Sequence, residues 1–288
     1  MTDKPLRIRR LARFGLTTAD AKSAAKFYEA AFGCRLVATD RLGGQNFERL
    51  MGVTGGADRI TLSLGREIIQ LMQFDSPGAD YPGASLSSDL VFQHFAIVVA
   101  DIERAFQQLS AIAGWTPIST AGPQRLPASS GGVVAFKFRD PEGHPLELLA
   151  FPDDASSNGQ VESPGEICVG IDHSAISVSD SAASIAFFQN LGLYVSARSF
   201  NHGAEQQRLD DVIGAEVDVT VLVPLCPTPH LELLCYRSGQ RRPTGVQRCN
   251  DIASTHLFFE RCMPSNTADR QFNVRSMQDP DGHIFFVD

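Results

Sequence analysis

The feature that most constrains this chain is an internal repeat with a period of about 80 residues. Three segments share one order of a short strand, an acidic residue, an apolar helix and a closing glycine; they span residues 13–33, 94–114 and 173–192. A fourth strand begins at Thr255, and the equivalent strand positions 13, 94, 173 and 256 are separated by 81, 79 and 83 residues. A fixed period of this kind indicates one repeated supersecondary unit. Strand-like segments follow each helix, so we expect four modules of the type βαβββ.

Start and stop signals frame each repeated helix. A carboxylate before a helix can accept hydrogen bonds from the free amides of the first turn, and a glycine tolerates the positive φ that ends a helix. The three pairs of signals are Asp20 and Gly33, Asp101 and Gly114, and Asp180 and Gly192. We therefore expect a helix between the members of each pair, with its apolar stripe packed on a sheet.

The modules fall into two kinds. Residues 47–53 (FERLMGV) resemble residues 206–212 (QQRLDDV), and residues 139–149 (RDPEGHPLELL) resemble residues 278–288 (QDPDGHIFFVD). Odd modules therefore resemble odd modules, and even modules resemble even ones. This alternation indicates that a unit of two modules was duplicated.

The duplication predicts the fold class and the domain limits. We expect an α+β protein with curved mixed sheets and two domains, at residues 7–152 (the first and second modules) and 167–288 (the third and fourth modules). The segment between them, at about residues 152–166, is rich in Pro, Gly and Ser, which is typical of a linker.

The fourth module is shorter than the others. His94 and Asp140 are 46 residues apart, whereas the equivalent His256 and Asp279 are only 23 apart. Residues 261–271 also carry no helical stripe. We therefore expect a truncated module without its helix, whose sheet face is covered by another element or left poorly packed. The oligomeric state stays open between a monomer and a homodimer in which a second chain covers this apolar surface.

Composition and charge exclude several classes of function. The net charge is −8 and the pI is near 5.4, so a basic surface for nucleic acid or anionic lipid is not expected. No run of about 18 apolar residues occurs, and the first ten residues lack the apolar core of a secretory signal. The six cysteines form no CxxC pair and mostly lie in apolar runs, which favours thiols in a reducing cytoplasm.

Histidines and glutamates stand inside apolar strands of the second and third modules. Strand alternation places His94 and His173 on the face of their strands that carries the smaller side chains, opposite the bulky residues that pack on the helix. Glu147 and Glu232 each lie among aliphatic residues in the last strand of a module. A carboxylate in such a strand is costly unless it is paired or binds a cation. Imidazole and carboxylate together suit Zn²⁺, Fe²⁺, Mn²⁺ or Ni²⁺.

This layout resembles the vicinal oxygen chelate superfamily, which includes glyoxalase I, the bleomycin and fosfomycin resistance proteins and the extradiol dioxygenases. The resemblance covers nearly the whole chain and is carried by residues 93–109, 140–149 and 172–193. It implies that 7–152 and 167–288 are glyoxalase-like domains. It also implies that each site is built from two modules, each supplying a first-strand His and a last-strand Glu.

The resemblance assigns candidate ligands to each module. They are Arg13 and Gln70 in the first, His94 and Glu147 in the second, His173 and Glu232 in the third, and His256 and Phe286 in the fourth. Two pairings of the modules are open. If neighbours pair, each of two sites has three ligands, and His256 joins His173 and Glu232. If the second module pairs with the third, one site holds His94, Glu147, His173 and Glu232. Every departure from the His and Glu pattern then falls in the other site. We favour the second arrangement.

Three functions follow from the resemblance. The first is a lyase or isomerase resembling glyoxalase I, in which one divalent ion (Zn, Ni, Fe, Mn or Co) stabilises an enediolate of a small oxygenated substrate. Glu147 or Glu232 would then move the proton at carbon. The second is an extradiol-type ring-cleavage dioxygenase with Fe²⁺, although Lys137 stands where that group has a tyrosine and Phe286 replaces a glutamate. The third is a metal-free protein that binds a small molecule, as drug-resistance members do.

Overall fold

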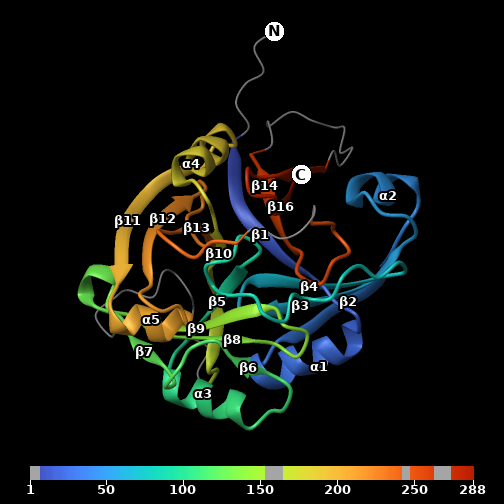
Figure 1. Cartoon of the computed structure of the whole chain (residues 1–288). Helices are drawn as coiled ribbons and strands as arrows, with labels where there is room; N and C mark the ends of the chain where they lie inside the picture. The colour runs from blue at the N-terminus through green and yellow to red at the C-terminus, as the bar shows by residue number, and fades with distance from the viewer. Residues whose placement is uncertain (1–6, 153–164, 242–246, 263–273) are drawn as a thin grey trace.

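The computed structural model describes residues 7–152, 165–241, 247–262 and 274–288 (Figure 1). The first module comprises β1 (Ile8–Thr17), α1 (Ala21–Phe32), β2 (Arg35–Leu42), α2 (Gln45–Met51), β3 (Ala57–Leu64) and β4 (Glu67–Phe74). The second comprises β5 (Gln93–Val99), α3 (Ile102–Ser110), β6 (Thr116–Pro117), β7 (Gln124–Arg125), the 3₁₀ turn η1 (Ala128–Ser130), β8 (Val134–Arg139) and β9 (Pro145–Ala150). The third comprises β10 (Cys168–Ser177), α4 (Ser181–Asn190), β11 (Tyr194–His202), α5 (Ala204–Asp210), β12 (Glu216–Val223) and β13 (His230–Tyr236). The fourth comprises β14 (Thr255–Arg261), β15 (Arg275–Gln278) and β16 (Ile284–Val287).

The three repeated helices begin at the predicted caps. The carboxylate of Asp20 accepts hydrogen bonds from the backbone amides of the first turn of α1, and Asp101 and Asp180 do the same for α3 and α4. Gly33 ends α1 in the left-handed conformation, with φ 71°. Helices α3 and α4 end slightly earlier than predicted, because their last carbonyls are satisfied by tightened turns before the chain reaches its glycine.

Two curved sheets carry all the strands of the described residues. The seven-stranded sheet has the order β15-β16-β14-β1-β4-β3-β2, and the nine-stranded sheet has the order β11-β12-β13-β10-β5-β9-β8-β6, with β7 beside β8. The first sheet therefore joins modules one and four, and the second joins modules two and three. Of the two pairings open from the sequence, the topology selects the one that we favoured. The predicted α+β fold class is confirmed, whereas the domain limits at 7–152 and 167–288 stay predictions.

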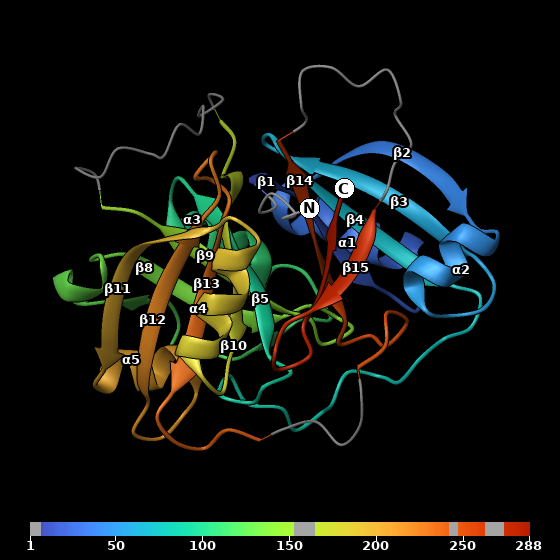
Figure 2. The same cartoon turned by 90° about the horizontal axis from the view of Figure 1, so that it is seen from above.

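One apolar core lies between the two sheets and the helices. Figure 2 shows α4 between the strands β11–β13 and the strands of module four. The rings of Phe188 on α4 and Phe285 on β16 have centroids 5.2 Å apart, and Phe187 lies 5.8 Å from the same ring. Helix α1 contacts the opposite sheet in the same way, through Phe32 and Phe138 at 6.1 Å. The two sheets are thus held together by helices that contact both of them.

The truncated fourth module is covered by a borrowed helix. Within the described residues no helix lies between β14 and β15, and most of the segment 261–271 lies outside them. The face of β16 that such a helix would cover packs against α4 of the third module. The sequence left open whether this face would be covered, and the structure answers that α4 covers it.

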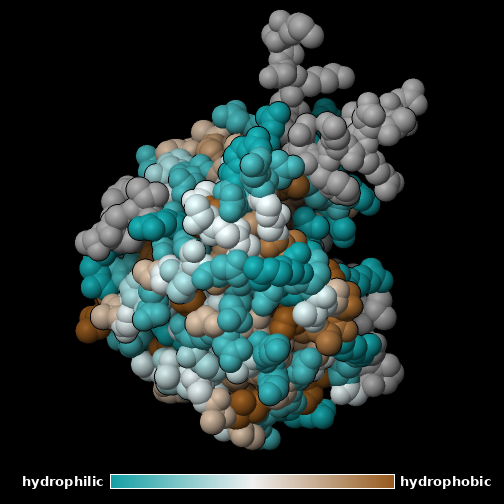
Figure 3. Space-filling view, turned by 90° about the vertical axis from the view of Figure 1, so that its right-hand side faces the viewer, coloured by the Kyte–Doolittle hydropathy of each residue, from teal (hydrophilic) through white to brown (hydrophobic). Residues whose placement is uncertain are grey.

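The surface shows mixed character. No helix in the described ranges is long and apolar enough to cross a membrane. Figure 3 shows the face on the side of α2 and the C-terminus, where hydrophilic residues cover much of the surface and apolar ones are interspersed.

Candidate metal centre

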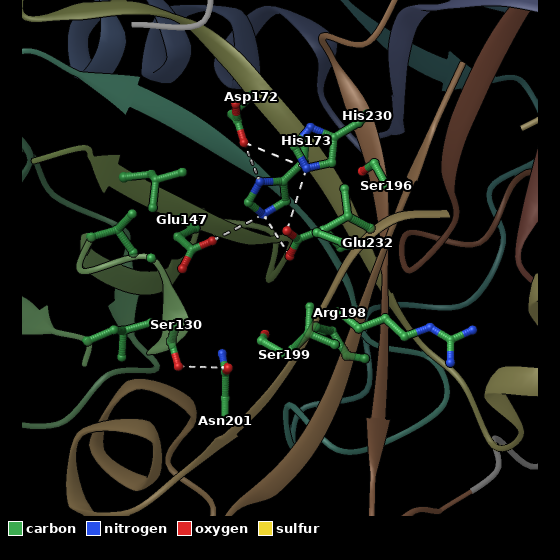
Figure 4. A pocket seen from close by; sticks show the side chains of 18 of the residues that line it. Ser130, Glu147, Asp172, His173, Ser196, Arg198, Ser199, Asn201, His230 and Glu232 are labelled. Carbon is green, nitrogen blue, oxygen red and sulfur yellow. Dashed lines mark hydrogen bonds and ion pairs between the residues drawn. The ribbon is translucent and has the colours of Figure 1, made fainter. Parts of the chain in front are cut away.

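The nine-stranded sheet curves around a cavity of about 590 Å³. Its walls include aliphatic side chains from β9, β12 and β13, together with residues of η1, β8, α5 and β11. The base of the cavity is polar and includes His94, Glu147, His173 and Glu232. All four residues predicted as metal ligands therefore line one cavity. Figure 4 shows Glu147, His173 and Glu232 directed toward one another within it.

Strand register explains how these side chains meet. His94 on β5 lies opposite Ala175 on β10, and His173 lies opposite Ala96 on β5. The same two alanines neighbour the glutamates, because Ala96 pairs with Glu147 and Ala175 with Glu232. Both alanines are fully buried. Each of the two central strands thus carries a small alanine methyl group on this face of the sheet. The four longer side chains occupy the space above these methyl groups.

The ligand atoms are spaced as neighbours around one ion would be. Nε2 of His94 lies 3.0 Å from Oε2 of Glu147, and Nε2 of His173 lies 3.5 Å from the same oxygen. Ligands about 2.1 Å from an ion and at right angles to one another would be about 3 Å apart. These three groups have ligand atoms all within 4.8 Å of one another. The donor set and spacing therefore fit a divalent transition metal.

Glu232 stands slightly outside this group of three. Its Oε2 lies 3.6 Å from Nε2 of His173, and its other oxygen lies 3.5 Å from Nε2 of His230. Glu232 is therefore close to one member of the cluster but turns partly toward His230. Its side chain is also more exposed than that of Glu147, at 20% against 7%.

Asp172 orients His173. Nδ1 of His173 lies 2.9 Å from Oδ2 of Asp172, which leaves Nε2 directed at the glutamates. A carboxylate on the far nitrogen of a metal-binding imidazole is a recurrent feature of metal sites, since it fixes the tautomer and the ring orientation. His230 lies 3.9 Å from the same carboxylate oxygen, and Asp172, His173 and His230 form a second compact set of ligand atoms. In contrast, Nδ1 of His94 has no hydrogen-bond partner among the described residues.

The charges of the cluster are strongly coupled. Burial alone would raise the pKa of Glu147, but hydrogen bonds from His173 and His94 outweigh it and hold that pKa well below its usual range. Burial likewise opposes the imidazolium of His173, yet the charge of Glu232 and the hydrogen bond to Asp172 raise its pKa well above the ordinary value. For Glu232, burial is outweighed by the two neighbouring imidazoles, which lower its pKa to about 2. Both glutamates are therefore anionic, and an ion that binds His173 would displace the extra proton from its imidazole.

The remaining candidates lie on the other sheet. His256 on β14 pairs with Gly15 on β1, and its Nε2 lies 3.1 Å from Oγ of Ser254. Its ring lies 5.4 Å from that of Phe286, and burial lowers the pKa of His256 to about 4. Arg13 and Gln70 belong to the same seven-stranded sheet. The structure therefore does not bring His256, the alternative ligand, to the cluster on β5, β9, β10 and β13.

Sequence reasoning missed two members of the cluster, Asp172 and His230. Alternation would place Asp172 on the face opposite His173, but the pairing of β10 with β5 shifts register between Ile171 and His173. Such a bulge re-aims a side chain, and it brings the aspartate beside the imidazole. His230 is the first residue of β13 and pairs with His173. Its spacing of two residues from Glu232 was the signal in the sequence that could have identified it.

Comparison with known proteins identifies the family. The family model of the Glyoxalase/Bleomycin resistance protein/Dioxygenase superfamily matches residues 10–148 and 170–286. The chain belongs to this superfamily, as the sequence motifs indicated. A comparison with curated proteins finds no match.

Solved structures share the fold at low sequence identity. Glyoxalase I from Zea mays is 16% identical, with 96% of this chain and 91% of that chain covered and a TM-score of 0.58. A Bacillus subtilis protein provisionally named a dioxygenase is 13% identical, with 99% and 85% covered and a TM-score of 0.55. At these identities the likeness extends to the fold of the whole chain and not to its chemistry.

Proposed function

We propose that this chain is a metal-dependent vicinal-oxygen-chelate enzyme that binds one divalent ion through His94, Glu147, His173 and Glu232. The observation that carries the proposal is the spacing of 3.0, 3.5 and 3.6 Å between buried imidazole and carboxylate atoms from four strands. A buried carboxylate between two imidazoles is expensive to maintain for structure alone. The fit of the donor set to Zn, Ni, Fe, Mn or Co supports a metal but does not choose among them.

The favoured reaction is an isomerisation or lyase reaction of the glyoxalase I type on a small oxygenated molecule. When bound, the ion would act as a Lewis acid on two adjacent substrate oxygens. The two glutamates then differ in role. Glu147 is held by both histidines and serves as a fixed ligand, whereas Glu232 is more exposed to the cavity and is the base that moves a proton at the substrate carbon.

The direct test of this proposal is metal analysis of untagged protein. We expect about one equivalent of a divalent metal per chain and a higher melting temperature when Ni²⁺, Zn²⁺, Mn²⁺, Fe²⁺ or Co²⁺ is added, because an ion that binds only the native state stabilises it. Glu232→Gln should keep the fold and abolish turnover, while His256→Gln should leave metal content unchanged. A chain that contains no metal and gains no stability from any of these ions would instead be a metal-free small-molecule binding protein.

A second candidate function is ring cleavage by an extradiol-type dioxygenase. The compact set of His94, Glu147 and His173 is two histidines and one carboxylate, which is the ligand type of non-haem Fe²⁺ oxygenases. Oxygen uptake with catechols after anaerobic loading with Fe²⁺ tests this alternative. Absence of uptake, together with isomerase activity on vicinal oxygen compounds, would favour the first function.

The partners and the cellular location of the protein are also proposals. We propose a small-molecule substrate and a cytoplasmic location, the latter because none of the six cysteines forms a disulfide. A homodimer remains a prediction. It has less support than the sequence suggested, since α4 covers the face of module four that a second chain was expected to cover.

A further inference from the structure

The two odd modules allow a position-by-position comparison. Helices α2 and α5 both have seven residues, follow a glycine with positive φ (Gly44 and Gly203) and end at a left-handed residue. The side-chain oxygen of Glu48 in one helix and of Gln207 in the other accepts a hydrogen bond from the amide seven residues later. Helices α2 and α5 are therefore equivalent, residue by residue, in the first and third modules.

Beside the metal centre, α5 supports a buried polar network around Asp210. Nζ of Lys137 lies 2.7 Å from Oδ1 of Asp210. Nε2 of Gln206 and the hydroxyl of Tyr236 donate to the other oxygen of Asp210, at 2.6 and 2.8 Å. Asp210 is fully buried and the other three residues are nearly so.

In the seven-stranded sheet, the equivalent positions are apolar or small. Phe47 and Met51 of α2 replace Gln206 and Asp210, Phe74 replaces Tyr236, and Ser276 replaces Lys137. Ser276 pairs with Phe286 on its neighbouring strand as Lys137 pairs with Glu147. Phe47, Met51, Phe74 and Phe286 pack in one apolar cluster. The fold therefore forms without the polar network, and within this chain the network accompanies the metal-ligand residues.

Lys137 lies on the cavity side of this network. Because it sits directly opposite Glu147 on the adjacent strand, the two side chains occupy the same face of the sheet. Lys137 and Gln206 both line the cavity that contains the metal-ligand residues. Burial lowers the pKa of Lys137, but Asp210 and Glu147 outweigh it and keep the ammonium charged. An ammonium has three donors, and Asp210 accepts from one of them.

Gln206 supplies a matching acceptor. Its Nε2 is used by Asp210, whereas its Oε1 is buried and has no hydrogen-bond partner among the described residues. A buried amide oxygen without a partner is costly, and a ligand that donates to it would remove that cost. The residues that line the cavity therefore include an ammonium paired with Asp210 that has further donors, and an amide whose oxygen has no partner among the described residues.

We propose that Lys137 is a substrate-binding residue that donates to a negatively charged oxygen of the substrate, while Gln206 accepts from a neighbouring hydroxyl. The substrate class is a small molecule with an apolar body and adjacent oxygens, one of them anionic, as in an α-hydroxy carboxylate or a catecholate. The proposal deepens the proposed function by naming the charge of the substrate, but the Lys137 contact does not depend on the metal.

Paired probes test the charge preference. Binding of mandelate is compared with that of neutral phenylethanediol, and binding of anionic nitrocatechol with that of neutral catechol, by calorimetric titration of the protein with and without Zn²⁺. For at least one pair, we expect the wild-type chain to prefer the anion by about tenfold or more, the range of a hydrogen bond to a charged group. The pair that shows the preference identifies the source of the negative charge.

Two neutral variants remove the ammonium without leaving Asp210 unpaired. Lys137→Met with Asp210→Met copies the apolar character of Met51, and Lys137→Gln with Asp210→Asn keeps the hydrogen-bonding shape. Both should reduce the preference for the anion to less than about threefold, with folding checked by circular dichroism. Arg59→Gln with Asp40→Asn removes an ion pair of the other sheet, and therefore also one positive and one negative charge; it is the control and should keep the preference.

Each outcome decides the inference. If the neutral variants keep the wild-type preference, or if the wild-type chain does not prefer an anion with or without Zn²⁺, Lys137 does not recognise the substrate charge and the inference is overturned. If the protein binds no metal but still prefers the anion through Lys137, the inference stands and the metal-dependent function fails.

Discussion

Glu147 on β9 and His173 on β10 lie 3.5 Å apart, Oε2 to Nε2, although the sequence assigns them to different repeats of the chain. The contact exists because β5 and β10 pair antiparallel at the centre of the nine-stranded sheet. Each half of the duplicated chain thus brings two of the four proposed ligands. The first and fourth modules form a second sheet, in which the equivalent positions hold Arg13, Gln70, His256 and Phe286.

Asp172→Asn should weaken metal binding without unfolding the protein. The carboxylate fixes His173 through Nδ1, and loss of such a partner typically costs about 10–100-fold in metal affinity. Competition against a chromophoric chelator measures the change. Asp101→Asn, at the cap of α3, is the control for a change of charge elsewhere, and equal affinities for the two variants would argue against the orienting role.

The metal content should be one ion per chain, and it should depend on only one of the two sheets. His94→Gln removes a proposed ligand and should reduce the bound metal to well below one equivalent. His256→Gln changes the equivalent imidazole of the seven-stranded sheet, whose Nε2 lies 3.1 Å from Oγ of Ser254 and whose ring lies beside Phe286 where the other sheet has a glutamate. Elemental analysis after gel filtration distinguishes the two. Loss of metal from the His256 variant would show that our assignment of sites is wrong.

The buried pair of His144 and Asp140 should make stability depend on pH. Nδ1 of His144 lies 2.8 Å from Oδ2 of Asp140, and Nε2 lies 2.9 Å from the carbonyl of Thr17. Burial opposes the charge of His144, but Asp140 outweighs it and raises its pKa. A raised folded-state pKa contributes stability that is fully present below the unfolded value of about 6.5 and is lost as the pH rises through the folded value.

His144→Gln should therefore cost most at mildly acidic pH. We expect a loss of about 3 kcal/mol in the free energy of unfolding near pH 5.5 and a smaller loss near pH 9, measured by urea denaturation. At still lower pH, Asp140 reverses the trend. Burial would raise its pKa, but His144 lowers it, so its contribution is present above about pH 4 and is lost as the pH falls through the folded value. The exposed His202→Gln is the control, and a cost for His144→Gln that does not vary with pH would contradict the coupling.

Phe188→Ala should destabilise the whole molecule. The ring is fully buried and lies 5.2 Å from Phe285, where α4 replaces the helix that module four lacks within the described residues. Truncation of a buried phenylalanine costs about 3–5 kcal/mol, and because both sheets share this helix we expect a single cooperative unfolding transition of lower midpoint. Phe200→Ala, on the exposed strand β11, should change the midpoint little. Separate melting of the two sheets in the Phe188 variant would show that the core between them is not cooperative.

Much of the fold could be predicted from local patterns in the sequence. The helix caps Asp20, Asp101 and Asp180 act on amides two or three residues away, so they can be recognised without knowing the fold. The faces of His94 and Glu147 follow from strand alternation, which is also local. What could not be predicted was the bulge at Asp172, since a single extra residue in the pairing of two strands reverses the face that alternation assigns.

The network around Lys137 was also beyond the sequence. In the sequence, Lys137 is recognisable only as a departure from the dioxygenase pattern, and Asp210 only as part of a repeated segment. Their contact at 2.7 Å joins the second module to the third. Only the comparison of α5 with α2 shows that the other sheet has apolar residues in place of this network. Long-range contacts of this kind depend on which modules share a sheet.

The sequence by itself determined the number of modules, the position of the three repeated helices and the residue types available for a metal, because these follow from periodicity and from the cost of burying charge in an apolar strand. Only the tertiary structure decided that the second module pairs with the third. That choice depends on which strand edges and helix faces complete a common core, and modules with the same local pattern do not encode it locally. The pairing of β5 with β10 therefore decided which histidines and glutamates share one cavity.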